Sequence, residues 1–350
     1  MGFPVLGAVK RAVLLVSLCE MCLAVRVFTA GDAGVTCFRI PAIVATPTGA
    51  LLAFAEARHG SCADDATREI ALRRSTDGGL TWSAIQFVAG NASLPVGNPY
   101  PIADATRVAL VVVLHADGGS GVGTGNGVAR SADDGATWTA LADADFGAAR
   151  GALPGPGAGL ASGGRWLVIS HLGAYVDDYV TLSDDAGASW RAAPGAAPFA
   201  SMDEAVLADL GGGELIANFR HAAEPTLGRG VSRSFDGGLS WSNVSFDAAL
   251  VGPVCQGALA VISPPGSPAR GALYFSNPAS ATARANLTVR RSDDGGRTWG
   301  GGSVTIQAGV SSGYSSLLRR TIIGDDARSG VLYEATDKGC IDFSTFPLAM

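Results

Sequence analysis

The chain has 350 residues, a net charge of −6 at neutral pH and a pI near 5.2. This acidic balance argues against a broad phosphate-binding surface, so nucleic acid is not an expected partner. Apolar residues make up 47% of the chain and 48 residues are glycine, which excludes a disordered protein and indicates a folded domain with many tight turns.

The first 24 residues have the layout of a secretory signal peptide. Lys10 and Arg11 precede an apolar run at residues 12–19, and a small-residue site follows near Ala24. The run is too short to span a bilayer, so no membrane span is expected. The alternative interpretation is a β-strand that closes the fold. We expect residues 1–24 to be a signal peptide and residues 25–350 to form one domain.

Two further patterns agree with the secretory route. Three Asn-x-Ser/Thr sequons begin at Asn91, Asn243 and Asn286. Beyond the predicted signal peptide the chain keeps four cysteines, which could form up to two disulfides, but their spacing does not specify the pairing. They are Cys37, Cys62, Cys255 and Cys340.

The first predicted strand has an arginine at its entry. Residues 38–41 read Phe-Arg-Ile-Pro and precede an apolar segment at residues 42–45. Because Pro41 has no N–H for a sheet ladder, we expect it at the start of this strand. Arg39 therefore stands between two large apolar residues at a strand entry, an unusual place for a guanidinium.

A second strand, residues 51–58, ends in two charges. Glu56 and Arg58 are two residues apart, so they share one face of the strand with apolar neighbours and need partners there. A polar loop follows and carries Asp64 and Asp65.

An eight-residue phrase then occurs five times, with Asp third, Gly fifth, Ser or Thr seventh and Trp last. Asp followed by Gly is turn chemistry, and strands lead into the copies, so each copy is predicted to be a hairpin tip. The copies recur at about fifty residues, which indicates radial repetition of small sheets. Five marked repeats and one unmarked repeat predict an all-β, six-bladed β-propeller with Asp-box hairpins. The copies are residues 75–82, 131–138, 183–190, 234–241 and 292–299.

The middle of the chain reads as two blades with glycine-rich loops. We expect Gly151 to Gly164 to be a long surface connection, because it is rich in small residues. The chain has only four histidines and no cluster of Cys and His, so no metal site and no cofactor are expected. His115, His171, Tyr175 and Tyr179 are interpreted as ordinary loop or core residues.

The last third of the chain contains the remaining charged candidates. Glu204 and Arg220 are sixteen residues apart across a predicted turn, so the two side chains can face one another in a hairpin. Arg284 precedes another strand, with Arg290 and Arg291 as nearby competitors for the same role. Tyr314 and Glu334 follow; Tyr314 lies within a Gly-Tyr-Ser-Ser sequence.

The combination of Phe-Arg-Ile-Pro with repeated Ser-x-Asp-x-Gly-x-Thr-Trp hairpins resembles the exo-sialidase (neuraminidase) family. Five further segments are similar to the animal lysosomal type of this family. They are residues 53–58 (Ala-Phe-Ala-Glu-Ala-Arg), 70–75 (Ile-Ala-Leu-Arg-Arg-Ser), 275–279 (Phe-Ser-Asn-Pro-Ala), 313–317 (Gly-Tyr-Ser-Ser-Leu) and 332–334 (Leu-Tyr-Glu). The resemblance covers the chain from about residue 36 to the end.

The resemblance implies a role for each candidate. Arg39, Arg220 and Arg284 would clamp a carboxylate, which suits three planar guanidiniums. Tyr314 would be the nucleophile and Glu204 its base. Asp64 would be the acid/base, with Asp65 as the alternative. Glu334 would hold Arg39, and Arg58, oriented by Glu56, would contact the substrate.

The implied function is hydrolysis of terminal sialic acids from a glycoprotein, glycolipid or oligosaccharide, with retention, in the lysosome or outside the cell. We expect an acidic pH optimum, because Asp64 must enter the reaction protonated. One alternative is a sialic-acid-binding lectin, which would need the arginines but not Tyr314, Glu204 and Asp64. Another is a glycosidase for neutral polysaccharides, which would leave three guanidiniums with no charge to neutralise. No motif indicates a particular protein partner.

Overall fold

The structure, a computed structural model, describes residues 24–115, 122–173, 176–194, 199–222, 225–264, 271–311, 313–322 and 327–350. The predicted signal peptide up to residue 23 and Tyr175 lie outside these residues. Helix is restricted to three single 3-10 turns in the described part: η1 (Asp32–Gly34), η2 (Gly147–Ala149) and η3 (Pro225–Leu227). None of these turns could cross a membrane.

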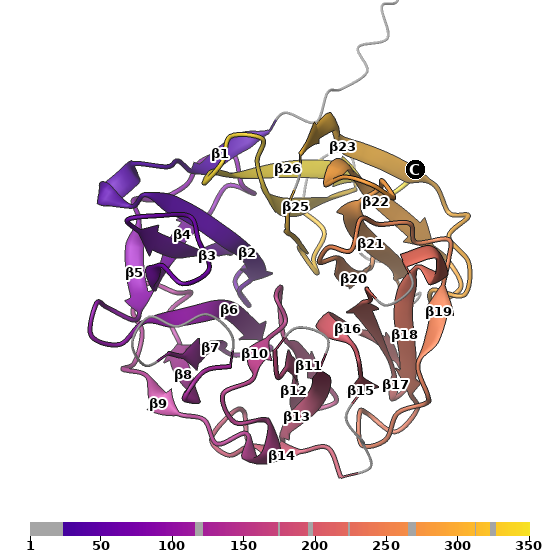
Figure 1. The fold of residues 1–350 in the computed structure, drawn as a ribbon, viewed down its shortest axis with the longest axis horizontal. Helices are drawn as coiled ribbons and strands as arrows, with labels where there is room; N and C mark the ends of the chain where they lie inside the picture. The colour runs from indigo at the N-terminus through magenta and orange to yellow at the C-terminus, as the bar shows by residue number, and fades with distance from the viewer. Residues whose placement is uncertain are drawn as a thin grey trace, which may run out of the picture.

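Six antiparallel sheets follow one another around a central axis, which confirms the six-bladed β-propeller (Figure 1). Blade 1 contains β2 (Cys37–Ala45), β3 (Leu51–His59), β4 (Thr67–Ser75) and β5 (Gln86–Ala89); blade 2 contains β6 (Val96–Ala103), β7 (Val108–Leu114), β8 (Gly125–Ser131) and β9 (Ala142–Asp143). Blade 3 contains β10 (Leu153–Pro154), β11 (Leu160–Ser162), β12 (Arg165–His171), β13 (Asp177–Ser183), β14 (Arg191–Ala192) and β15 (Phe199–Ala200). Blade 4 contains β16 (Asp203–Gly211), β17 (Glu214–Arg220), β18 (Arg229–Ser234) and β19 (Ser245–Asp247); blade 5 contains β20 (Ala258–Ile262), β21 (Ala272–Pro278), β22 (Ala285–Ser292) and β23 (Ser303–Ser311). Blade 6 contains β24 (Ser315–Leu317), β25 (Arg328–Glu334), β26 (Ile341–Pro347) and β1 (Val25–Phe28).

The ring is closed by the two ends of the described chain. Strand β1 pairs antiparallel with β26, with Val25 opposite Phe343, and it becomes the outer strand of blade 6 (Figure 1). The closing strand is therefore residues 25–28. Because β26 and β1 come from opposite ends of the sequence, no hairpin connects the third and fourth strands of this blade. This explains why one blade carries no copy of the repeated phrase.

The five Asp-box hairpins share one hydrogen-bond pattern. In the first copy, the Ser75 hydroxyl donates to Asp77 Oδ1 at 2.7 Å and accepts from the backbone N–H of Gly79 at 2.8 Å. The backbone N–H of Thr81 donates to Asp77 Oδ1 at 2.9 Å. Gly79 has φ +93°, a conformation that favours glycine. The Thr81 hydroxyl also donates to the Asp77 carboxylate, and this bond, followed by those from the Thr81 backbone and the Ser75 hydroxyl, lowers the pKa of Asp77 to about 2, so Asp77 stays charged above that pH.

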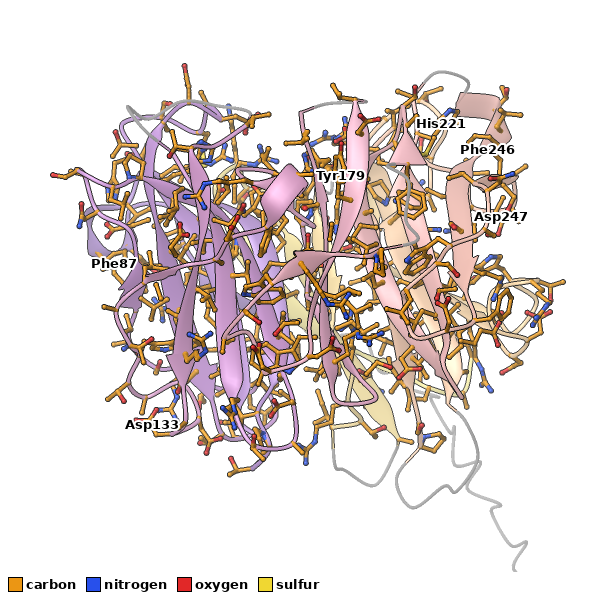
Figure 2. All side chains as sticks on the ribbon, turned by 90° about the horizontal axis from the view of Figure 1, so that it is seen from below. Phe87, Asp133, Tyr179, His221, Phe246 and Asp247 are labelled. Carbon is orange, nitrogen blue, oxygen red and sulfur yellow. A yellow bond between two sulfur atoms is a disulfide. The ribbon has the colours of Figure 1, made fainter. Side chains whose placement is uncertain are left out.

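Strand direction separates the two ends of the propeller. Each hairpin joins the third and fourth strands of its blade, whereas the start of the first strand and the end of the second lie at the opposite end. Figure 2 shows this separation: Asp133, in a hairpin, lies at one end of the molecule, and His221, which follows the end of β17, lies at the other. Side chains at first-strand starts and second-strand ends of different blades therefore gather on one face.

Three innermost strands carry a bulge near that face. The register of β2 shifts between Arg39 and Ala42, where Ile40 has φ +56°, and Pro41 lies within the bulge. The prediction that Pro41 begins the strand is wrong, because the strand starts at Cys37 and the bulge accommodates a residue without an N–H. The register of β16 shifts in the same way next to Glu204, which has φ +20°. Bulges redirect side chains, and these two lie at candidate residues.

The prediction of a surface connection from Gly151 to Gly164 is wrong. The segment is mostly buried and supplies the inner part of blade 3, where β10 and β11 both pair with β12. Small residues are needed there because the blades crowd together towards the axis. The partly buried Arg319 guanidinium donates to the carbonyls of Ala158 and Gly159, and to that of Leu207 in blade 4. These bonds tie the segment to the inner strand of blade 4.

Candidate active site

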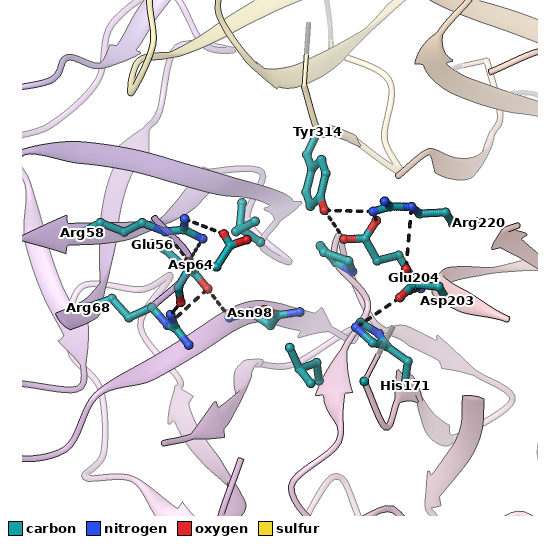
Figure 3. A pocket seen from close by; sticks show the side chains of 14 residues that line it. Glu56, Arg58, Asp64, Arg68, Asn98, His171, Asp203, Glu204, Arg220 and Tyr314 are labelled. Atoms are coloured by element: carbon teal, nitrogen blue, oxygen red, sulfur yellow. Dashed lines mark hydrogen bonds and ion pairs between the residues drawn. The ribbon is translucent and has the colours of Figure 1, made fainter. Parts of the chain in front are cut away.

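A cavity of about 280 Å³ lies on the face opposite the hairpins (Figure 3). Its walls come from first-strand starts and second-strand ends, as strand direction requires. Glu204 is the second residue of β16, Arg220 ends β17 and Tyr314 directly precedes β24. Across the cavity lie Arg58, from the end of β3, and Asp64, from the loop between β3 and β4. Candidates spread over 250 residues of sequence therefore surround one space.

Tyr314 and Glu204 form a direct hydrogen-bonded pair. The Tyr314 hydroxyl donates to Glu204 Oε1, and Arg220 donates to Glu204 Oε2 at 2.7 Å and to the phenol oxygen at 3.3 Å. Burial raises the pKa of Tyr314 well above its usual value of about 10, and the negative charge of Glu204 raises it further. The phenol is therefore neutral in this state, with its proton already directed at a carboxylate.

Three guanidiniums surround the same phenol. The guanidinium carbons of Arg39 and Arg284 lie 5.3 and 5.5 Å from the centre of the Tyr314 ring, and Arg220 contacts its hydroxyl. The two competitors of Arg284 are engaged elsewhere: Arg290 donates to Asn277 at 2.9 Å and Arg291 pairs with Asp293. The structure thus brings together Arg39, Arg220 and Arg284.

The three arginines face two neighbouring cavities. Arg220 lines the cavity of about 280 Å³, whereas Arg39 and Arg284 line a second cavity of about 490 Å³. The second cavity is larger, but the first contains the phenol, its carboxylate and Asp64, so we place the chemistry there. Tyr314 lies at the boundary between the two. An anion held by all three arginines would span this boundary.

Glu334, at the end of β25, holds Arg39 in position. Its carboxylate accepts from Arg39 Nε at 2.9 Å and from Arg39 Nη2 at 3.3 Å. The same carboxylate accepts from the backbone N–H of Tyr314 at 3.1 Å. A Cβ atom at Gly313 would overlap with Glu334, so this position requires glycine. Glu334 therefore couples the position of one arginine to that of the phenol.

On the other side of the cavity every charge is paired. Arg58 donates to Glu56 at 2.6 and 2.9 Å and to Asp64 Oδ1 at 2.7 Å (Figure 3). Arg39 donates to the same Asp64 oxygen at 3.2 Å. Partial burial raises the pKa of Asp64, but the hydrogen bond and charge of Arg58, together with Arg39 and Arg68, outweigh it and lower the pKa. In this state Asp64 is ionised.

Glu56 receives an unexpected set of contacts. The backbone N–H of Asn98, in the bulge of β6, donates to Glu56 Oε1 at 2.8 Å, and Arg68 lies 3.8 Å from that oxygen. Burial raises the pKa of Glu56, but Arg58 and Arg68 lower it more, so the carboxylate stays charged although it is fully buried. Arg68 and Asn98, which line the cavity, were missed by sequence reasoning.

Three more residues near Glu204 were also missed. Asp203 accepts from the backbone N–H of Glu204 at 2.9 Å and lies 3.7 Å from Arg220 and 3.5 Å from His171. Burial, and then the charge of Glu204, raises the pKa of Asp203 to about 7. Asp178 is fully buried close to Asp203. Burial, and then the charge of Asp203, raises the pKa of Asp178 well above its usual value. Burial lowers the pKa of His171 to about 4.

His171, interpreted from the sequence as an ordinary loop or core residue, is buried at the end of β12 and also lines the cavity. A signal for it exists once the propeller is assumed: His171 ends the second strand of blade 3, the position that Arg58, Arg220 and Glu334 occupy in their own blades. His115 follows the second strand of blade 2 and is also buried.

One disulfide joins the strand of Arg39 to the loop of Asp64. Cys37 in β2 is bonded to Cys62, and Cys255 and Cys340 are buried free thiols. No group of three or more His, Cys, Asp or Glu that could hold a metal ion occurs in the described ranges.

Comparisons with known proteins assign the family. Residues 49–322 match the model of the BNR repeat-like domain. This chain belongs to the BNR repeat-like family. It is 34% identical to a sialidase of Micromonospora viridifaciens over 87% of this chain and 50% of that protein. It is 28% identical to an exo-alpha-sialidase of Arthroderma benhamiae over 91% of this chain and 85% of that protein.

The fold comparison agrees with the family. The structure named Hadza microbial sialidase Hz136 superimposes with a TM-score of 0.80 at 26% identity, over 93% of this chain and 68% of that one. The BNR repeat-like chain spans about half the length of the Micromonospora relative. Of the two relatives named above, the Micromonospora protein is bacterial and the Arthroderma protein is fungal.

Proposed function

We propose that the protein is an exo-α-sialidase, a glycoside hydrolase that removes terminal α-ketosidically linked sialic acids with retention. The observation that carries the proposal is the convergence of three guanidiniums from blades 1, 4 and 5 on one phenol. Sialic acid carries a carboxylate on its anomeric carbon. Arg39, Arg220 and Arg284 would bind that carboxylate, which leaves the anomeric carbon beside the Tyr314 hydroxyl.

Tyr314 is the proposed nucleophile and Glu204 its base. A phenol approaches a negatively charged substrate without the repulsion that a carboxylate would meet, and sialidases are known for a Tyr nucleophile. Because the pKa of Tyr314 is raised, the phenol needs a base to lose its proton. Its hydrogen bond to Glu204 directs the proton to that carboxylate as the C–O bond to the enzyme forms. Water then hydrolyses this intermediate, which gives net retention.

Asp64 is the proposed acid, which protonates the leaving oxygen and then activates the water. Without ligand, Asp64 is held ionised by Arg58 and Arg39. A substrate carboxylate competes for the Arg39 guanidinium and adds a negative charge nearby. Both changes raise the pKa of Asp64, so substrate binding itself favours the protonated acid.

The same observations give less support to the alternative function, a sialic-acid-binding lectin. Carbohydrate binding requires a clamp, but it does not require a neutral phenol hydrogen-bonded to a carboxylate at the clamp's centre. A glycosidase for neutral polysaccharides is weaker still, because a neutral sugar offers no charge to the arginines.

The finer assignments are also proposals. Motifs such as residues 53–58 and 313–317 support a relation to the animal lysosomal type, with glycoprotein, glycolipid (ganglioside) or oligosaccharide substrates. The predicted signal peptide supports the secretory pathway, with the lysosome or the exterior as destination. Asn91, Asn243 and Asn286 are exposed, as glycan attachment would require.

One assay tests the proposal. The full chain is incubated with a fluorogenic aryl α-sialoside between pH 4 and 7, with aryl glycosides of neutral sugars as controls. We expect hydrolysis of the sialoside alone, with the α-anomer of sialic acid as the first product by NMR. A first product of β configuration would overturn retention, and binding without turnover would favour the lectin.

A further inference from the structure

The loop between β3 and β4 carries Asp64 at the mouth of the cavity. The Asp64 side chain is 71% exposed, and the neighbours Ser61, Ala63 and Asp65 are exposed as well. Such a loop has almost no apolar surface to anchor it. A general acid, however, must stay within hydrogen-bond reach of the leaving oxygen. The position of Asp64 therefore depends on how this loop is attached to the rest of the domain.

The Cys37–Cys62 disulfide is the covalent attachment. Cys62 is the one residue between Ser61 and Asp65 that is not exposed. It is bonded to Cys37, which is fully buried in β2, with a Cα–Cα distance of 5.3 Å. The bond thus connects the exposed loop to the rigid inner strand of blade 1.

Both cysteines stand two residues before a residue of the site. Cys37 precedes Arg39 by two positions on β2, and Cys62 precedes Asp64 by two positions in the loop. These two site residues contact each other, because Arg39 donates to Asp64 Oδ1 at 3.2 Å. Arg58 reinforces this arrangement, because one nitrogen donates both to the Cys62 carbonyl at 2.8 Å and to Asp64 at 2.7 Å.

We infer that the Cys37–Cys62 disulfide positions the general acid, holding Asp64 at a set distance from the first arginine of the clamp. This inference rests on the proposed function. The contribution of the disulfide to catalysis should depend on the leaving group. A sugar alkoxide must be protonated as its bond to the anomeric carbon breaks, whereas an activated phenolate can depart without help. Loss of the disulfide should therefore slow alkyl-type substrates selectively.

The test uses the double variant Cys37→Ser, Cys62→Ser in the full chain. We measure kcat/KM for a sialoside of lactose and for an activated aryl sialoside. The ratio of the two values should fall about tenfold or more, a part of the roughly 10² to 10⁴ that general acid catalysis contributes. This ratio is unaffected by the fraction of folded enzyme, so a loss of stability alone does not change it. Asp64→Asn should lower the ratio further, and adding the double variant to it should change little more.

Cys340→Ser is the matched control, because it removes a buried thiol outside the disulfide. Its ratio should equal that of the wild type. If the double variant does not fold, the wild type is treated with a thiol reductant, and opening of the disulfide is followed by alkylation and mass spectrometry. An unchanged ratio, or an equal loss on both substrates, would overturn the inference alone. If the wild type hydrolyses neither sialoside, the proposed function is overturned, and this inference with it.

Discussion

The two sides of the cavity use charge in opposite ways (Figure 3). The acid side comprises Arg39, Glu56, Arg58, Asp64 and Arg68; the base side comprises His171, Asp178, Asp203, Glu204 and Arg220. On the acid side, guanidiniums outnumber carboxylates, and the pKa values of Glu56 and Asp64 are lowered. On the base side, Asp203 and Glu204 both lie within ion-pair distance of Arg220, Asp178 is buried close to them, and the pKa values of Asp203 and Asp178 are raised.

The opposite pKa shifts on the two sides explain how the site can hold its titratable groups in defined protonation states before substrate binds. The base side is desolvated, so it keeps the Tyr314 phenol neutral and next to Glu204. The acid side is ion-paired, so it keeps Asp64 ionised in this state, and the proposed mechanism has an anion on the arginines release it. A bound carboxylate therefore alters the acid side most.

Tyr314→Phe removes the proposed nucleophile, which lies between the two sides. We expect kcat for an aryl sialoside to fall by about 10³ or more, while binding of sialic acid changes little, because the three arginines remain. Steady-state kinetics and calorimetric titration measure the two quantities. Tyr179→Phe, which alters a tyrosine of β13, is the control. Unchanged turnover in the Tyr314 variant would remove it as the nucleophile.

Arg39→Ala breaks the acid side, because it removes one arm of the clamp and the partner of Glu334 and Asp64. We expect kcat/KM to fall about 30- to 1,000-fold, corresponding to the 2 to 4 kcal/mol typical of truncating one partner of a buried charge pair. The matched control is Arg290→Ala, which removes an arginine bound to Asn277. Similar losses in both variants would contradict a specific clamp.

The pH profile on a poor leaving group sharpens the role of Asp64. Its lowered pKa means that the protonated fraction of the free enzyme decreases as pH rises through the acidic range. We therefore expect kcat/KM for a lactose sialoside to decrease from pH 4 to 7. Asp64→Asn should lose this dependence. Activity that rises steadily to pH 8 would count against Asp64 as the acid.

Asp203→Asn tests the base side through stability. Because the folded-state pKa of Asp203 is raised to about 7, the folded protein holds a proton there that the unfolded chain releases near pH 4. This stabilisation is present below about pH 4 and is lost as pH rises to about 7, by at most about 4 kcal/mol. An asparagine cannot ionise, so the Tm of the variant relative to wild type should rise by a few degrees between pH 4.5 and 7.5. A constant difference would mean that Asp203 keeps a normal pKa.

Local patterns were sufficient for the repeated parts of the fold. Each hairpin is stabilised by bonds within eight residues, such as those of Ser75 and Asp77, so its sequence reveals its structure directly. Strand alternation predicted that Glu56 and Arg58 share one face of a strand, and the hairpin length predicted that Glu204 and Arg220 face each other. The buried position of Gly151 to Gly164 did not follow, because small residues suit both an exposed loop and a crowded axis.

Turn chemistry and strand periodicity act over a few residues, so the amino-acid pattern alone predicted the blade count, and the resemblance to the sialidase family supplied the roles of the site candidates. The three-dimensional contacts were needed to show that Arg284 rather than Arg290 approaches Tyr314, that Cys37 pairs with Cys62, and that Asp203 and His171 lie next to each other near Glu204. These contacts join residues from different blades, or a strand to a loop that follows a later strand of the same blade. Their energies depend on burial and on charges brought together by ring closure, which no short stretch of sequence contains.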